Sequence, residues 1–129
     1  VRAIDTNVLV RLLIEDDPAQ TAVAAQIFAQ GRVFIGTTVL LETGWVLRSA
    51  YRFSPARIAR KLREVAGLPG VTLEEPAVAA QALDWHEQGM DFADALHLAL
   101  AADCETFITF DRKLAKSAKR LGAMPVEQH

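Results

Sequence analysis

The opening stretch VRAIDTNVLVRLL, residues 1–13, joins a short apolar strand to a helix through one acidic residue. Residues 1–4 predict a short buried strand, and residues 8–13 predict a helix. Asp5, Thr6 and Asn7 stand at the junction, where each side chain can cap the helix by accepting hydrogen bonds from free backbone N–H groups. The stretch therefore predicts a strand–helix unit with a carboxylate at the edge of the core.

The same alternation of strand and helix continues through the rest of the chain. Further helices are expected over residues 18–30, 37–52, 55–67, 76–88, 92–103 and 112–121, and further strands over residues 33–36, 71–73, 106–110 and 124–127. Thr37 or Thr38 is the expected cap of the third helix. Short strands that alternate with helices are typical of an α/β fold with a mostly parallel sheet. A chain of 129 residues fits one domain, so we expect a single domain over residues 1–129.

The composition is that of a globular protein, with 51% hydrophobic and 23% charged residues. No apolar run reaches the roughly 18–20 residues of a membrane span, and no signal peptide is recognised, so a cytoplasmic protein is expected. The single cysteine, Cys104, excludes an internal disulfide and is interpreted as a small core residue. Trp45 and Trp85 are also interpreted as core residues, so no base-stacking surface is predicted.

The net charge of −2 hides an uneven distribution of basic residues. Two stretches hold eleven of the fourteen, namely Arg48, Arg52, Arg57, Arg60, Lys61 and Arg63 in the first and Arg112, Lys113, Lys116, Lys119 and Arg120 in the second. The first stretch contains one acid, Glu64, and the second contains none. Each stretch is either a solvated helix face or a surface for a polyanion.

Four acids stand in otherwise apolar settings. Asp5 and Asp111 each follow a predicted strand, and ligands of open α/β sheets gather at the carboxyl ends of strands. Glu42 is the only charge in TVLLETGWVL, residues 38–47, and Asp94 lies in the apolar stretch MDFADALHLALAA, residues 90–102, one turn after Asp91. Each has an ordinary alternative: a helix cap, a favourable acid in a first helical turn, or, for Glu42, an ion pair with an arginine such as Arg11 or Arg48.

A cluster of these four acids would repel itself unless cations were bound. No His or Cys pair has zinc spacing, and all-oxygen ligands suit Mg²⁺ or Mn²⁺. Such an ion polarises a phosphoryl oxygen, lowers the pKa of a bound water and stabilises a leaving oxygen. If the four acids converge, the sequence predicts metal-dependent cleavage or transfer of phosphate esters.

Four motifs in order, AIDTNVLVRLL, LLETGWVL, DFADALHLALA and TFDRKLAK, resemble those of PIN-domain ribonucleases, and in particular VapC-type toxins of type II toxin–antitoxin systems. The resemblance implies a PIN-like three-layer α/β fold whose short, mostly parallel central sheet is flanked by helices. It also implies a metal-dependent endoribonuclease that cleaves RNA. The catalytic, metal-binding acids carried over by position are Asp5, Glu42, Asp94 and Asp111, with Mg²⁺ or Mn²⁺ as the cofactor.

The resemblance also implies residues and partners around that site. Thr6, Asn7 and Thr109 match polar residues that support the acids, and Asp91 is a candidate outer acid. His97 is either a phosphate contact or a partly buried helix residue. Arg112, Lys113 and Lys116 follow Asp111 and are the first candidates for RNA binding. A VapC-type toxin would form a homodimer and bind a cognate antitoxin in a groove, which we expect along residues 39–47 and 57–68.

Other functions fit parts of the pattern. A housekeeping PIN nuclease of RNA processing or decay would carry the same acids. A Mg²⁺-binding receiver-like signalling domain has a similar length, but its phospho-acceptor and its lysine are not evident, and Glu42 would have no role. A haloacid-dehalogenase-type phosphatase would need a second acid where the chain has Asn7. A PIN fold retained only for binding would not need the complete set of four acids.

Overall fold

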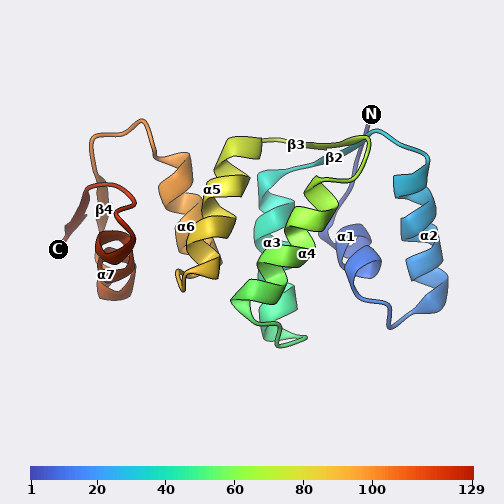
Figure 1. Cartoon of the computed structure of the whole chain (residues 1–129), viewed down its shortest axis with the longest axis horizontal. Coiled ribbons are helices and arrows are strands. Elements are labelled where there is room, and N and C mark those ends of the chain that lie inside the picture. The colour runs from blue at the N-terminus through green and yellow to red at the C-terminus, as the bar shows by residue number, and fades with distance from the viewer. The chain divides into compact units, whose positions relative to one another are not determined.

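Parallel pairing of short strands organises both parts of the chain in the computed structural model, which describes residues 1–129 (Figure 1). The chain divides into two units, Val1–Pro76 and Ala77–His129, called here the N-terminal and the C-terminal unit. Every strand pair in both units is parallel. The prediction of an α/β fold with parallel strands is therefore confirmed.

The N-terminal unit holds a three-stranded sheet in the order β1–β2–β3. Its strands are β1 (Arg2–Ala3), β2 (Val33–Ile35) and β3 (Val71–Leu73), and its helices are α1 (Thr6–Leu13), α2 (Pro18–Ala29), α3 (Thr37–Ser49) and α4 (Pro55–Ala66). Helix α1 packs against α2 and α3, and α3 packs against α4. The core of this unit includes Leu9, Ile35, Leu47 and Ile58, none of which is exposed to solvent.

The C-terminal unit holds a two-stranded parallel sheet and three helices. Its elements are α5 (Pro76–Glu87, which begins on the last residue of the N-terminal unit), α6 (Phe92–Leu100), β4 (Phe107–Thr109), α7 (Arg112–Leu121) and β5 (Val126–Gln128). Helix α7 packs against both strands. The buried His86 fixes the turn between α5 and α6, because its Nδ1 donates to the carbonyl oxygen of Met90 at 2.7 Å and its ring lies 5.3 Å from that of Phe92.

Six of the seven helices begin at the predicted residue. Asp17 and Ser54 cap α2 and α4, each with proline in the first turn, and α7 has the predicted bounds. Helices α3 and α6 each end three residues before the predicted end. The predicted threonine cap of α3 is wrong, because Gly36 is the N-cap and makes no side-chain bond. No helix is both long and apolar enough to span a membrane.

Three predictions of burial are wrong. Both residues of β1 are exposed, because this two-residue strand lies at the edge of its sheet and pairs only with β2. Cys104 is exposed in the turns that follow α6. Trp45 is 70% exposed on the outer face of α3, whereas Trp85 is 9% exposed and belongs to the core, as predicted.

Candidate active site

Asp5 ends the β1 segment and caps α1. Its Oδ1 accepts a hydrogen bond from the backbone N–H of Val8 at 3.2 Å, and its Oδ2 accepts none from the protein. Of the three candidate caps at this junction, Asp5, Thr6 and Asn7, it is Asp5 that caps the helix. The cap holds the carboxylate in place through one oxygen and leaves the other oxygen open to a cation.

Thr6 connects the start of α1 to Glu42 on α3. Its hydroxyl donates a hydrogen bond to Oε1 of Glu42 at 3.2 Å, and the two helices pack against each other. Glu42 is exposed and forms no ion pair, because Arg11 binds Asp16 instead, at 2.7 Å, and no carboxylate lies within salt-bridge distance of Arg48. The exposed side chain therefore needs no buried arginine, and the ion-pair interpretation of Glu42 is wrong.

A residue that sequence reasoning missed holds the start of α3. Oε1 of Glu74, the residue after β3, accepts a hydrogen bond from the backbone N–H of Thr37 at 2.9 Å. A carboxylate at a helix N-terminus satisfies a free N–H and is favoured by the helix dipole. Glu74 thus anchors the helix that carries Glu42, and its separation of 37 residues from Thr37 hides the contact from any local pattern.

We expect the Thr6→Val variant to cleave nucleic acid about tenfold more slowly, because Glu42 loses the hydrogen bond that orients it. Thr6→Ser keeps the hydroxyl and should cleave at the wild-type rate. The measurement is the initial rate of metal-dependent cleavage by both variants at equal, checked melting temperatures. Equal rates for Thr6→Val and wild type would show that this contact does not position Glu42 for the reaction.

Two helix caps place the acids of the C-terminal unit. Oδ2 of Asp91 accepts from the backbone N–H of Asp94 at 3.1 Å, which makes Asp91 the cap of α6. Oδ1 of Asp111 accepts from the N–H groups of Lys113 and Leu114 at 2.8 and 3.1 Å and caps α7. The Thr109 hydroxyl in turn accepts from the N–H of Asp111 at 2.9 Å. Asp111 therefore resembles Asp5, with one oxygen in a cap and the other without a protein partner.

The carboxylates of this unit repel one another at Asp94. Burial raises the pKa of Asp94 above its ordinary value, and the negative charges of Asp91 and Asp111 raise it further. His97 and Lys113 act in the opposite direction. Of the two alternatives for His97, the partly buried helix residue is wrong, because its side chain is exposed. A divalent cation beside Asp94 would relieve the repulsion between these acids.

We expect the Asp94→Asn variant to be more stable than wild type without metal, with a melting temperature a few degrees higher at pH 8. The raised pKa means that the folded state binds the Asp94 proton more tightly than the unfolded state does. The stability gained from that proton is full at low pH and is lost as the pH rises through the raised pKa. The difference between the two proteins should therefore shrink as the pH falls toward 3.8, the ordinary value. Thermal unfolding in EDTA from pH 4 to 8 measures it, and a less stable variant at pH 8 would contradict the expectation.

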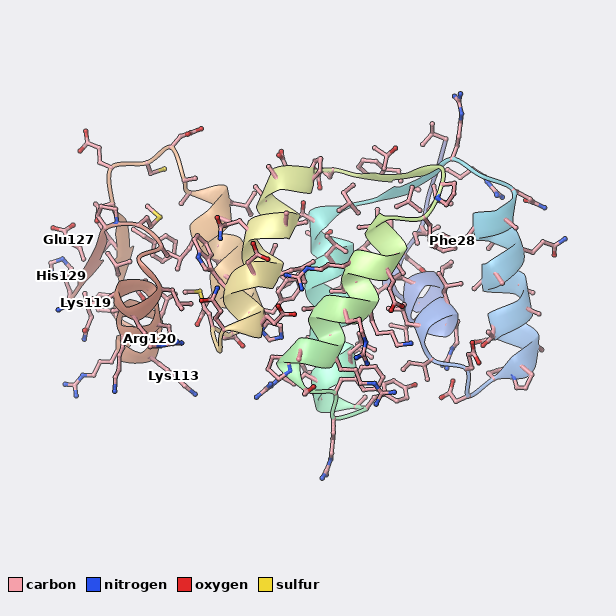
Figure 2. The ribbon with its side chains drawn as sticks, in the orientation of Figure 1. Phe28, Lys113, Lys119, Arg120, Glu127 and His129 are labelled. Atoms are coloured by element: carbon pink, nitrogen blue, oxygen red, sulfur yellow. The ribbon has the colours of Figure 1, made fainter.

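The predicted RNA-binding cations are exposed at the start of α7. Arg112, Lys113 and Lys116 follow Asp111, and no carboxylate lies within salt-bridge distance of their side chains. Figure 2 shows the Lys113 side chain extending away from α7, with Lys119 and Arg120 further along the same helix. The surface beside Asp111 is therefore basic.

The donor atoms of both units suit a hard divalent cation. Asp5 and Glu42 in the N-terminal unit, and Asp94 and Asp111 in the C-terminal unit, offer only carboxylate oxygens, the ligand type that Mg²⁺ and Mn²⁺ prefer. Within neither unit do three His, Cys, Asp or Glu side chains gather in a group that could hold a metal ion. The fit to the metal therefore rests on the chemistry of the donor atoms and not on a group of three acids within one unit.

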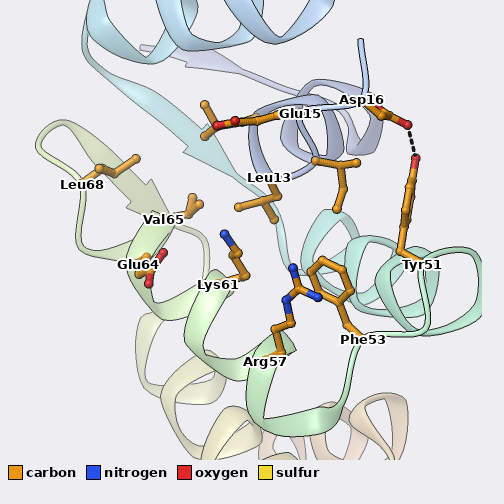
Figure 3. Close-up of a pocket in the computed structure, with 12 residues that line it drawn as sticks. Leu13, Glu15, Asp16, Tyr51, Phe53, Arg57, Lys61, Glu64, Val65 and Leu68 are labelled. Carbon is orange, nitrogen blue, oxygen red and sulfur yellow. Dashed lines mark hydrogen bonds between the residues drawn. The ribbon is translucent and has the colours of Figure 1, made fainter. Parts of the chain in front are cut away.

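Of the pockets in the N-terminal unit, one includes Asp5 and another lies along α4. The first, of about 430 Å³, lies between α1 and α2 and is lined by Asp5, Asn7, Val8, Arg11, Ala19, Gln20, Val23, Ala24 and Ile27. The second, of about 630 Å³, lies between the end of α1 and α4. In Figure 3, Arg57 and Lys61 point into the second pocket beside Leu13 and Phe53, and the Arg57 guanidinium lies 3.8 Å from the centre of the Phe53 ring. Neither cation has a carboxylate within salt-bridge distance.

The sequence profile of the PIN domain matches residues 3–120, which include all four predicted acids. The chain belongs to the PIN-domain family. The comparison with curated proteins finds no match. PIN domains are generally nucleases that act on nucleic acids, and they typically use divalent metals such as Mg²⁺. Membership in the PIN family makes the receiver-like and phosphatase interpretations wrong.

Proposed function

We propose that this PIN domain is a Mg²⁺- or Mn²⁺-dependent endoribonuclease and that Asp5, Glu42, Asp94 and Asp111 are its metal ligands. The observation that carries the proposal is the arrangement that Asp5 and Asp111 share. Each follows a strand, caps the next helix with one oxygen and leaves the second oxygen without a protein partner. The raised pKa of Asp94 adds a carboxylate whose charged form a bound cation would stabilise.

The chain's own residues would orient the acids and the substrate. The Thr6 hydroxyl donates to Glu42, and the Thr109 hydroxyl accepts from the backbone N–H of Asp111. Asp91 caps the first turn of α6. A bound Mg²⁺ or Mn²⁺ would activate water and stabilise the leaving oxygen of the phosphodiester. Arg112, Lys113 and Lys116 would bind phosphates and offset the repulsion between RNA and the acids. The proposal includes the single domain over residues 1–129.

The cleavage assay that tests this function uses purified protein and a labelled single-stranded RNA. We expect cleavage within the strand in Mg²⁺ or Mn²⁺ and none in EDTA, with activity restored when the metal is added back. A DNA strand of the same sequence shows whether the sugar is recognised. Absence of RNA cleavage in either metal, or undiminished cleavage in EDTA, would contradict the proposal.

We further propose that the biological role is that of a VapC-type toxin, a homodimer in the cytoplasm inhibited by a cognate antitoxin. The four motifs support this role, and so does the 630 Å³ pocket along α4, one of the two helices where the groove is expected. Its wall includes Leu13, Phe53 and Val65, which suits a segment with aliphatic side chains. The charged lining is mixed, with two cations that lack carboxylate partners and the acids Glu15, Asp16 and Glu64. No residue of the other expected segment, 39–47, lines this pocket.

Growth of cells on induced expression separates the toxin from a housekeeping PIN nuclease. A toxin should arrest growth, the Asp94→Asn variant should not, and co-expression of a small protein encoded beside the gene should restore growth. Unimpaired growth at a measured level of active wild-type protein would favour the housekeeping role in RNA processing or decay.

A further inference from the structure

Helix α3 places an exposed tryptophan on the same face as Glu42. The exposed residues of this helix are Thr38, Glu42, Trp45, Arg48 and Ser49. Residues three and four apart are neighbours on a helix surface, so these five form one stripe. Trp45 is 70% exposed, although tryptophan is highly buried on average. The stripe therefore carries one large aromatic ring in an otherwise polar surface.

The neighbours of Trp45 favour a ligand that is flat and negatively charged. The four other exposed residues of the stripe are polar or charged, so they do not form the contiguous apolar patch typical of the centre of a protein interface. Arg48 lies one turn beyond Trp45, and no carboxylate lies within salt-bridge distance of its guanidinium. A nucleobase can stack on an exposed ring, and a neighbouring phosphate can bind a free arginine.

The spacing along α3 suits a short piece of single-stranded nucleic acid. A helix rises 1.5 Å per residue, so Glu42 and Arg48 are separated by about 9 Å along the axis, with Trp45 midway. That length matches about two to three nucleotides of a stacked strand. Thr6 holds Glu42 at one end of this stretch, and Ser49 Oγ donates to the carbonyl oxygen of Trp45 at 2.6 Å near the other.

We propose that Trp45 is a stacking platform for a nucleobase of the substrate and that Arg48 binds a phosphate of the same strand. The inference rests on the proposed nuclease function, because it places the base one helical turn from a proposed metal ligand. Stacking uses the face of a base and is tolerant of sequence. Trp45 should therefore bind unpaired nucleotides of any sequence and should not bind a duplex, whose bases cover one another.

Tryptophan fluorescence tests the proposal on the full chain in EDTA, so that the strand is not cleaved. The only other tryptophan, Trp85, is buried, and Trp45 dominates any change caused by a ligand at the surface. We expect an eight-nucleotide RNA to quench the fluorescence, and the same strand with abasic positions to bind about tenfold more weakly. The Trp45→Leu variant should lose about tenfold in affinity for the intact strand, whereas Trp45→Phe should retain most of it.

Comparison of the Trp45→Leu and Trp45→Phe variants separates stacking from apolar contact. Equal binding of the intact and abasic strands, or wild-type affinity of Trp45→Leu, would overturn the proposal. A third result would also overturn it. If RNA leaves the wild-type fluorescence unchanged, and sedimentation shows a wild-type dimer that Trp45→Leu converts to a monomer, Trp45 belongs to a protein interface. Cleavage of RNA in Mn²⁺ is measured separately. Quenching without cleavage would support stacking on Trp45 and contradict the proposed nuclease function. Cleavage without quenching would support the nuclease function and contradict stacking on Trp45.

Discussion

Replacing Asp5 or Asp94 by asparagine is expected to lower the rate of metal-dependent RNA cleavage by about a hundredfold or more. Asparagine has the shape of aspartate but no negative charge, so it is a poor ligand for a hard divalent cation. In Asp5→Asn the amide oxygen can still accept from the N–H of Val8, because asparagine and aspartate are equally good helix caps. The loss should therefore be one of metal binding and not of folding.

Asp17→Asn is the matched control for this loss. Asp17 also caps a helix in the N-terminal unit and accepts from the N–H of Gln20 at 3.2 Å, but it is not among the proposed ligands. The control should cleave at the wild-type rate, while both site variants fail in saturating Mn²⁺. If Asp5→Asn or Asp94→Asn cleaves as fast as Asp17→Asn, that carboxylate does not bind the catalytic metal.

Removing the three cations that follow Asp111 is expected to weaken RNA binding by tens of fold in about 0.1 M salt. The variant combines Arg112→Ala, Lys113→Ala and Lys116→Ala. If each cation neutralises one phosphate, the slope of log affinity against log salt should become about 2 less steep, since single strands contribute roughly 0.7 per contact. Alanine favours the helix, and loss of positive charge from its N-terminal turns suits the dipole, so α7 should remain folded.

The other end of α7 supplies the comparison for this variant. Lys119→Ala combined with Arg120→Ala removes two exposed cations from the last turn of the same helix (Figure 2). We expect this pair to leave the salt slope close to that of wild type, as measured by fluorescence titration in EDTA at several salt concentrations. Equal effects of the two variants would mean that net charge, and not the position beside Asp111, controls binding.

The sequence predicted what is local and missed what depends on tertiary packing. Asp17-Pro18 and Ser54-Pro55 mark helix starts by their own chemistry, and the acids Asp5 and Asp111 were identified because each follows a strand. The bond between Thr6 and Glu42 joins residues 36 positions apart, so no local pattern predicts it.

The outer face of α3 was also beyond prediction. The sequence of α3 is mostly apolar, and only the packing of this helix against α1 and α4 shows which of its residues remain exposed. The sequence therefore predicts Trp45 as a core residue, although its side chain is exposed. The same packing shows that Glu42 lies on the exposed face, where it needs no buried partner.

Mn²⁺ titration followed by NMR tests most directly whether the four proposed carboxylates are metal ligands. A paramagnetic Mn²⁺ ion broadens the signals of nearby backbone amides. We expect substoichiometric Mn²⁺ to broaden the amides around Asp5, Glu42, Asp94 and Asp111, and we expect Asp94→Asn to weaken the broadening. Unchanged amide signals around these four residues, or broadening that Asp94→Asn leaves unaffected, would contradict the proposed metal site.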